Sequence, residues 1–380
     1  MKFADCPTVC LSLCLLFLIE APGRAQDGSV AVSVEKKAKV KKAPVLKPLF
    51  ATDQVLSLTL TARMQPILRD RVPPKADEKG TSYPALLTVA ADSIMASAAS
   101  SGVLVQLPAQ LQVRGHFRRS AANCQFPPLY LTLPKQTTKG TPFTKQSSLK
   151  LVTHCNNESF VLREYLVYRL YNLMSDFSFK ARLARVTYAD SAKKQAAFTR
   201  WGILLEDDSD MAKRNRARIY KSRYRAEHCD TLATATMSLF EYMIGNTDWS
   251  VVYQHNMRLV LDSTRTRPMP VPYDFDHSGI VEAPYAKPAE QLEISSVRER
   301  LYRGPIYPLS VLNQVIARYN AMKPQVYALY ETDERVDRGY VKQTLAYLDD
   351  FYALINDPKT ARAVFQDPTG RGVQIKGLSK

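Results

Sequence analysis

Residues 244–280 of this 380-residue chain, IGNTDWSVVYQHNMRLVLDSTRTRPMPVPYDFDHSGI, contain its most informative pattern. An apolar stripe with helical spacing runs up to this stretch, and Gly245 is the residue type that commonly ends a helix. Two alternating runs follow, 257–261 and 269–273, with a polar turn between them. The pattern predicts a helix, a loop and then an antiparallel β-hairpin.

The predicted hairpin brings together polar side chains that are distant in the sequence. Pairing Leu261 with Met269 places Asn256 opposite Asp274 at the open end of the hairpin. Asp248 lies in the loop that precedes the first strand. We therefore expect two carboxylates and one carboxamide to converge at this point.

Oxygen ligands of this kind suit Mg²⁺ or Mn²⁺, which keep several waters and are commonly completed by substrate phosphates. Phosphoryl transfer requires one Asp near the nucleophile, with an Asn and a second Asp holding metal. Each residue alone is more often a loop-capping residue, because Asp and Asn favour turns. Together they would crowd negative charge unless a cation offsets it. Asp276 adds a third carboxylate, which is either a second metal ligand or a residue that fixes the loop.

Three short motifs resemble those of the spore-coat CotH-like secretory kinases, an atypical protein kinase family. They are Gly245-Asn246-Thr247-Asp248, His255-Asn256 and Tyr273-Asp274-Phe275-Asp276. Weaker similarity extends upstream, through Val113-Arg114-Gly115, Leu162-Arg163-Glu164-Tyr165-Leu166 and Leu204-Leu205-Glu206. The resemblance covers about residues 110–280, and only its C-terminal third is specific.

The resemblance implies an α+β, two-lobed atypical protein-kinase-like fold, with a β-rich N-lobe and an α-rich C-lobe. It also implies that Asp248 is catalytic and that the metal ligands are Asn256, Asp274 and Asp276. Where family members tend to carry Lys-Lys, this chain has Phe-Pro-Pro-Leu, so the expected ATP-binding residues are Lys150, its partner Glu164, and Glu206. The alternative is that Lys150 and Glu164 are ordinary exposed charges, which pair weakly.

The pattern along the chain predicts four segments. Residues 1–25 read as a signal peptide, 26–50 as a basic linker, 51–206 as a β-rich lobe with one long helix, and 207–380 as an α-rich lobe with the hairpin. Strand patterns occur at 56–61, 111–113, 129–133, 149–152, 181–188 and 198–205, and helical patterns at 159–175, 232–243, 310–323, 324–332 and 336–357.

The N-terminus predicts export. Lys2 precedes an apolar run over 9–19, and Gly23-Arg24-Ala25 offers a cleavage site. The run is shorter than the roughly 20 residues of a spanning helix, so we expect a secreted or periplasmic chain without a transmembrane span. An uncleaved membrane anchor is the alternative.

The cysteines outside the predicted signal peptide indicate a disulfide. Three of the six lie in the signal, which leaves Cys124, Cys155 and Cys229 in an oxidising compartment. Three thiols allow one bridge and one leftover, and the sequence leaves the pairing open. No Cys-x-x-Cys pair occurs and the five His are scattered, so a zinc site has no support.

The chain is strongly basic, with 52 Lys and Arg against 36 Asp and Glu, a surplus of 16 positive charges. Export argues against nucleic acid as the partner of this charge. Residues 213–225 include seven basic side chains in thirteen positions. This basic cluster is either a solvated surface segment or a site for an anionic ligand such as phosphate.

A conventional kinase or a P-loop enzyme is excluded, because Gly-rich nucleotide loops and His-Arg-Asp are absent. Ser-based hydrolysis has little support without Gly-x-Ser-x-Gly. A glycosidase that uses Asp248 and Asp274 is a further alternative, although Asn256 favours metal and phosphate over a sugar ring. The leading hypothesis is an exported atypical kinase that transfers the ATP γ-phosphate to a protein Ser/Thr or to another hydroxyl acceptor. The alternative, from another class, is a non-catalytic binding or structural protein of the cell envelope, a pseudokinase scaffold.

Overall fold

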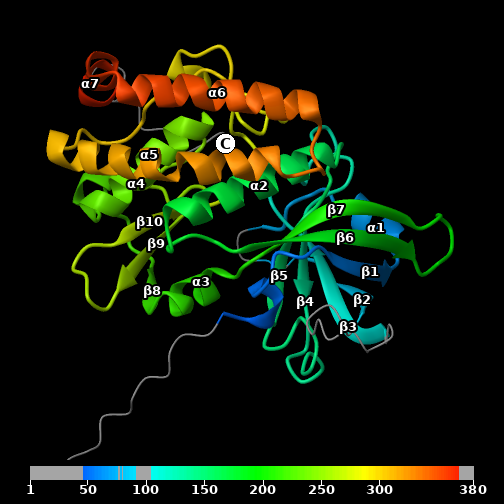
Figure 1. Ribbon diagram of the computed structural model, residues 1–380. Coiled ribbons are helices and arrows are strands. Elements are labelled where there is room, and N and C mark those ends of the chain that lie inside the picture. Colours follow the sequence, from blue (N-terminus) through cyan, green and yellow to red (C-terminus); the bar gives the residue numbers. More distant parts are fainter. Residues whose placement is uncertain (1–45, 76–77, 79, 91–103, 368–380) are drawn as a thin grey trace, which may run out of the picture. The chain divides into compact units, whose positions relative to one another are not determined.

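The computed structural model describes residues 46–75, 78, 80–90 and 104–367, and these described residues belong to one compact unit (Figure 1). Its strands are β1 (Leu56–Ala62), β2 (Tyr83–Ala90), β3 (Leu104–Val113), β4 (Leu129–Thr132), β5 (Ser148–Val152), β6 (Ala181–Asp190), β7 (Phe198–Leu205), β8 (Ala217–Tyr220), β9 (Met257–Asp262) and β10 (Met269–Pro272). Its α-helices are α1 (Met64–Arg69), α2 (Ser159–Met174), α3 (Asp208–Arg214), α4 (Thr231–Ile244), α5 (Leu309–Glu331), α6 (Arg338–Asn356) and α7 (Pro358–Gln366). Short 3-10 helices are η1 (Pro48–Phe50), η3 (Ala226–His228) and η4 (Glu290–Leu292).

Seven strands close into a barrel in the order β1, β2, β3, β4, β5, β7, β6. β1 completes the closure, because it pairs antiparallel with β2 and parallel with β6. Alternate residues of β1, namely Leu56, Leu58 and Leu60, are buried in an interior that side chains from all seven strands fill. The barrel is therefore a packed core.

The expected α+β, two-lobed atypical protein-kinase-like fold is wrong. The strands of the β-rich half close on themselves as a mixed barrel, whereas the expectation required an N-lobe sheet. Alternation and short apolar runs predicted six strands individually, and the structure confirms all six; it adds β2, which was not predicted. Closure depends on the parallel pairing of Leu56 with Ala184, far apart in the chain, and no local pattern specifies that contact.

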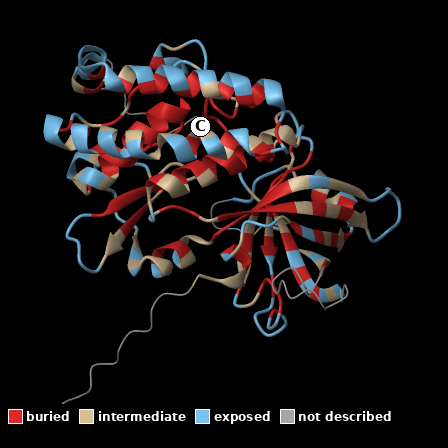
Figure 2. Cartoon of the chain, viewed as in Figure 1, coloured by how far each residue is buried: buried red, intermediate tan, exposed pale blue. Residues whose placement is uncertain are grey.

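α2 connects the barrel to the remaining helices. It packs on the outer side of β6 and β7 and also packs against α4 and α5. The C-terminal half of β7 is buried on both faces: Leu204 points into the barrel, and Ile203 and Leu205 belong to the helical core. Figure 2 shows α2 and α4 largely buried, while the outer faces of α5 and α6 are exposed. This packing holds the C-terminal end of α4 near the barrel.

The helix predictions for α2, α4 and α6 are confirmed, but the two helices expected at 310–323 and 324–332 are a single helix, α5. Pro324 lies inside it and removes one backbone hydrogen bond. Val315 and Tyr319 before the proline, and Val326 and Tyr330 after it, are all buried in the same core. Burial of one continuous face outweighs the local cost of the proline.

The predicted hairpin forms, but its register differs by one residue from the expected one. Met269 pairs with Val260, where Leu261 was expected. The Tyr273 N–H donates to the Asn256 carbonyl at 3.0 Å, so Asn256 faces Tyr273 and Asp274 follows one residue later. Both polar residues still lie at the open end of the hairpin.

The two faces of the hairpin explain this register. Val260, Met269 and Val271 pack in the helical core, whereas Met257 and Leu259 pack in a separate cluster. Successive strand residues point to opposite faces, so a one-residue slip would move a whole set of side chains to the wrong core. The observed pairing keeps each set on its own face.

Cys124 and Cys155 form a disulfide, and Cys229 is a buried free thiol. The prediction of one bridge and one leftover cysteine is confirmed. The bond joins the segment between β3 and β4 to the residues after β5. It thus restrains the loop that follows β3.

The predicted signal at 1–25 and most of the linker at 26–50 lie outside the described residues. Their roles stay predictions. Among the helices of the described ranges, none has both the length and the apolar character that a membrane span requires.

Candidate functional site

A pocket of about 220 Å³ lies between the barrel and the β9–β10 hairpin. Four of the expected site residues line it, namely Asp248, Asn256, Asp274 and Asp276. The barrel side contributes residues 114–118 and Pro128, and His255 and His277 complete the lining. We call it the carboxylate pocket.

Asp248 is positioned by the end of α4. Gly245 caps that helix with φ +67°, a left-handed conformation that favours glycine. The Asn246 side-chain oxygen then accepts the Asp248 N–H at 3.0 Å, and its Nδ2 donates to the Glu241 carboxyl at 2.9 Å. Burial raises the pKa of Glu241 to about 8. A buried carboxyl group on α4 therefore anchors the loop that carries Asp248.

Asp248 is held from the other side by the residues that precede β9. Its Oδ1 lies 3.0 Å from His255 Nε2, and its Oδ2 accepts a hydrogen bond of 3.0 Å from Asn256 Nδ2. The same Asn256 nitrogen donates to the Asp248 carbonyl at 2.9 Å. These bonds use the amide nitrogen of Asn256, while its amide oxygen accepts no hydrogen bond within the described chain.

Asn256 and Asp274 both have left-handed backbone conformations, with φ +50° and +64°. Such angles are uncommon for residues other than glycine and concentrate at functional sites. The Tyr168 hydroxyl fixes this conformation in part, because it accepts the Asp274 N–H at 2.9 Å. The Asp274 side chain is 32% exposed and that of Asp276 only 7%, so Asp274 is the more accessible carboxylate.

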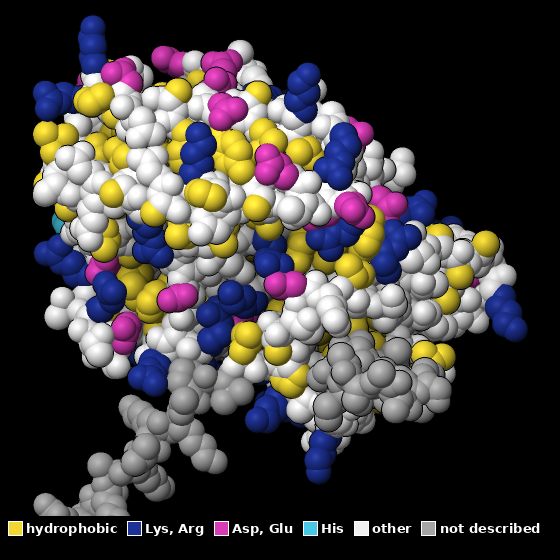
Figure 3. Space-filling view, in the orientation of Figure 1, with side chains coloured by type: hydrophobic (Ala, Val, Ile, Leu, Met, Phe, Trp, Pro, Cys, Tyr) yellow, Lys and Arg dark blue, Asp and Glu magenta, His cyan; other side chains and the backbone are white. Residues whose placement is uncertain are grey.

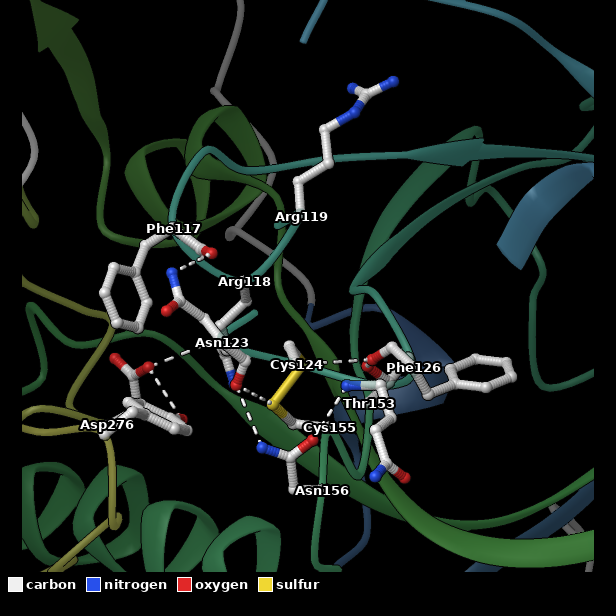
Figure 4. The surroundings of a disulfide bond; sticks show 12 residues. Phe117, Arg118, Arg119, Asn123, Cys124, Phe126, Thr153, Cys155, Asn156 and Asp276 are labelled. Carbon is white, nitrogen blue, oxygen red and sulfur yellow. Dashed lines mark hydrogen bonds and ion pairs between the residues drawn. A yellow bond between two sulfur atoms is a disulfide. The ribbon is translucent and has the colours of Figure 1, made fainter. Parts of the chain in front are cut away.

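Arg118 is the arginine of the pocket that contacts its carboxylates. Its guanidinium lies 3.4 Å from Asp274, 3.4 Å from Asp276 and 3.7 Å from Glu164. Burial disfavours its charged form, but the carboxylates outweigh burial and raise the pKa of Arg118 well above its usual value. Figure 4 shows Arg118 and Asp276 on one side of the Cys124–Cys155 bond and Phe126 on the other.

The pKa values of the two buried carboxyl groups beside Arg118 are shifted in opposite directions. Burial raises the pKa of Glu164 to about 8, and its Oε1 accepts no hydrogen bond from the described residues. Burial also opposes ionisation of Asp276, but Arg118 lowers the pKa of that carboxyl below its usual value. Asp276 also accepts a hydrogen bond of 3.1 Å from Tyr285. Glu164 is thus a buried group that still lacks a partner for one oxygen.

The expected pair of Lys150 and Glu164 does not form. Lys150 Nζ lies 2.9 Å from Asp208 and 4.8 Å from the ring centroid of Tyr273, while Glu164 pairs with Arg118. The reason is the strand geometry, since the neighbours of Lys150 on β5 fill the barrel and Lys150 points outward. Lys150 therefore lies against Tyr273, the residue that precedes Asp274.

Glu206 does not line the carboxylate pocket. Its carboxylate accepts hydrogen bonds of 3.0 Å from Arg214 and from the backbone N–H of Lys180. The side chain is buried, so these bonds satisfy it within the fold.

Sequence reasoning missed Arg118. Its only local signal is the basic run Arg114-Gly115-His116-Phe117-Arg118-Arg119 after a strand. The adjacent Arg119 pairs instead with Asp70 beyond α1. Which of the two arginines reaches the carboxylates depends on the path of the loop in space.

The donor set of the pocket fits a hard divalent cation. Within the described ranges, no group of three or more His, Cys, Asp and Glu side chains is arranged to hold a metal ion. A ligand set that includes the amide oxygen of an Asn is not one of these groups, because it is not made of His, Cys, Asp and Glu alone. Asn256 and the accessible Asp274 both line the pocket, and amide and carboxylate oxygens are ligand types of Mg²⁺ and Mn²⁺.

A scan against protein-family models finds no match for this chain, and no curated protein matches it. The geometry of the carboxylate pocket therefore carries the functional interpretation.

Proposed function

We propose that this protein is an exported, metal-dependent phosphotransferase that moves the γ-phosphate of ATP to a protein Ser/Thr or to another hydroxyl acceptor. One observation carries the proposal: Asp248, Asn256 and Asp274 line a single pocket although they come from three positions around the hairpin. The disulfide supports export, because such bonds persist in oxidising compartments.

Asn256 and Asp274 would hold Mg²⁺ or Mn²⁺ in this pocket. Such an ion, when bound, offsets the charge of phosphate oxygens. A pocket of about 220 Å³ is smaller than the roughly 300–1,000 Å³ of sites that enclose a whole small molecule. It therefore suits the phosphate end of a nucleotide, with the remainder outside the pocket.

Asp248 would orient the acceptor hydroxyl and take its proton. The acceptor oxygen attacks the γ-phosphorus, and the bond to the β–γ bridging oxygen breaks with its electron pair left on ADP. His255, 3.0 Å from Asp248, holds the carboxylate in place. Arg118 would hold Asp274 and Asp276 in position.

The second candidate function is a non-catalytic binding or structural protein of the cell envelope. Arg118 favours this alternative, because its guanidinium already supplies a cation to three carboxyl groups. On that alternative, the polar residues of the pocket stabilise the loops and bind no metal.

The first prediction separates the two functions. Incubated with γ-labelled ATP, Mn²⁺ and a Ser/Thr-rich acceptor protein, the wild type transfers label, and Asp274→Asn lowers the rate about 100-fold or more, because it removes a metal ligand. Asp350→Asn, a change of an exposed carboxylate on α6, serves as the matched control and keeps the wild-type rate.

A second readout does not depend on the acceptor. ATP with Mn²⁺ raises the melting temperature of the wild type by mass action, and Asp274→Asn reduces the shift. Transfer at equal rates in wild type and Asp274→Asn would contradict the phosphotransferase. Absence of both transfer and the thermal shift in the wild type would favour the binding protein.

A further inference from the structure

The loop that carries Asp248 also lines a second, larger cavity of about 730 Å³. Its lining includes Trp249, Tyr253, Ile306, Arg303, Arg225 and Glu227. We call it the Trp249 cavity. Its volume falls within the range of sites that enclose a small molecule or a few residues of a peptide.

Apolar side chains form part of the lining of the Trp249 cavity. Trp249 is buried, and its Nε1 donates to the Asn246 carbonyl at 3.2 Å, which fixes the indole. Tyr253 and Ile306 are 41% and 48% exposed although both are large and apolar. Large apolar side chains exposed around a cavity commonly mark a binding site.

Positive charge lies on the wall of the same cavity. Arg303 donates to the carbonyl oxygens of Thr247 and Trp249, so its described hydrogen bonds go to the backbone and not to a carboxylate. Arg225 is exposed, and its contact with Glu227 is a 3.4 Å pair between two exposed side chains. Such a pair contributes little and leaves the arginine able to bind another anion.

The basic cluster at 213–225 borders this cavity. Gln254 donates to the carbonyl oxygens of Lys221 and Ser222 at 3.2 and 2.9 Å, which ties the cavity loop to the cluster. The Arg223 guanidinium lies 5.9 Å from the ring centroid of Tyr253. Figure 3 shows Lys and Arg side chains, with a few Asp and Glu among them, over the region of β8 and α3, where the cluster begins.

We propose that the Trp249 cavity binds an acidic polypeptide segment, with an apolar side chain inside it and flanking carboxylates against Lys221, Arg223 and Arg225. The combination of an apolar cavity with a basic border fits such a segment by charge and by shape. The proposal rests on the proposed function in one respect. Trp249 directly follows Asp248, and on the proposed function the bound segment would belong to the acceptor protein.

Intrinsic fluorescence tests occupancy directly, because the chain has two tryptophans, Trp201 on β7 and Trp249. The Trp201→Phe variant leaves Trp249 as the only reporter. We expect a saturable change in its emission on titration with the Trp-free peptide Glu-Glu-Leu-Ser-Glu-Glu. The matched peptide with four lysines in place of the glutamates should cause no change.

Charge variants in this background locate the contact. Arg223→Glu and Arg225→Glu should each weaken binding of the acidic peptide about five- to tenfold. Glu227→Gln should tighten it, because that change removes the negative charge beside Arg225. Arg318→Glu, an equal charge reversal at an exposed position on α5, should leave the affinity unchanged.

The outcomes separate this proposal from the proposed function. Saturable binding that Arg225→Glu weakens and Arg318→Glu does not supports the cavity assignment, even if the wild type transfers no phosphate. Asp274→Asn should retain peptide binding while losing transfer. No change in Trp249 emission, equal binding of both peptides, or equal effects of the two charge reversals would overturn the cavity proposal.

Discussion

Arg118 divides the carboxyl groups around it into two kinds. Asp276 and Glu164 are buried against it, and Asp276 has a second partner in Tyr285. Asp274 forms an ion pair with Arg118 through one carboxylate oxygen, but its side chain is partly exposed. A single arginine thus leaves Asp274 as the carboxylate that a ligand reaches most easily.

Glu241 leads to a prediction on pH dependence. Burial raises the pKa of this carboxyl from 4.5 to about 8, so the folded state binds its proton more tightly than the unfolded state does. The free energy of unfolding therefore falls as pH rises from about 4.5 towards about 8. Glu241→Gln still accepts the Asn246 hydrogen bond, and it should remove a pH-dependent contribution of about 3 kcal/mol.

Urea unfolding at about pH 5 and about pH 8 measures this effect. The loss of stability between the two pH values should be smaller in Glu241→Gln than in wild type. Glu334→Gln, at an exposed position, is the control and should behave like wild type. Equal pH dependence in wild type and Glu241→Gln would show that Glu241 is ionised in the folded protein.

At the scale of the element, the end of α4 determines where Asp248 lies. A Cβ atom at Gly245 would lie 2.3 Å from the Tyr347 hydroxyl and 2.9 Å from the Val297 carbonyl, in addition to the strain of φ +67°. Gly245→Ala should therefore lower the free energy of unfolding by about 3 kcal/mol, because clash adds to backbone strain. It should also slow phosphate transfer, since the loop after α4 must shift.

Gly140 provides a matched control for the strain that a left-handed backbone conformation causes in alanine. Its φ is +75°, and a Cβ atom there would meet nothing within 4 Å. Gly140→Ala should cost only the strain of the left-handed conformation, about 1 kcal/mol. Urea unfolding compares the two variants, and equal losses would mean that packing against Tyr347 and Val297 is unimportant.

At the scale of the whole molecule, the disulfide fastens the Arg118 loop to the barrel. Cys124 and Cys155 are separated by 31 residues, and a bridge of that span stabilises by about 3 kcal/mol, chiefly through the unfolded state. The Cys124→Ala/Cys155→Ala variant should lose this stability, and reductant should then have no further effect on it.

Chemical denaturation with and without reductant measures the contribution. Cys229→Ala is the control, because it removes a buried free thiol and should leave the effect of reductant intact. If reductant does not change the unfolding of the wild type, the bridge adds nothing to stability.

Local patterns predicted much of this protein from its sequence. Spacing of apolar residues located α2 and α4, and Gly245 marked the end of α4. Alternation and short apolar runs located six of the seven barrel strands, and alternation located the hairpin that brings Asn256 near Asp274; β2 was not predicted. These features depend on interactions between residues that are only a few positions apart in the chain. Their physical cause can therefore be read from the local sequence.

The tertiary structure alone decided the contacts between distant segments. It closed the barrel through β1 and β6, chose the hairpin register from the two cores, and joined Glu164 to Arg118 where Lys150 was expected. It also continued α5 through Pro324. Each of these outcomes depends on burial and on charge pairing between segments that are far apart in the chain. Short-range sequence patterns carry no information about such contacts.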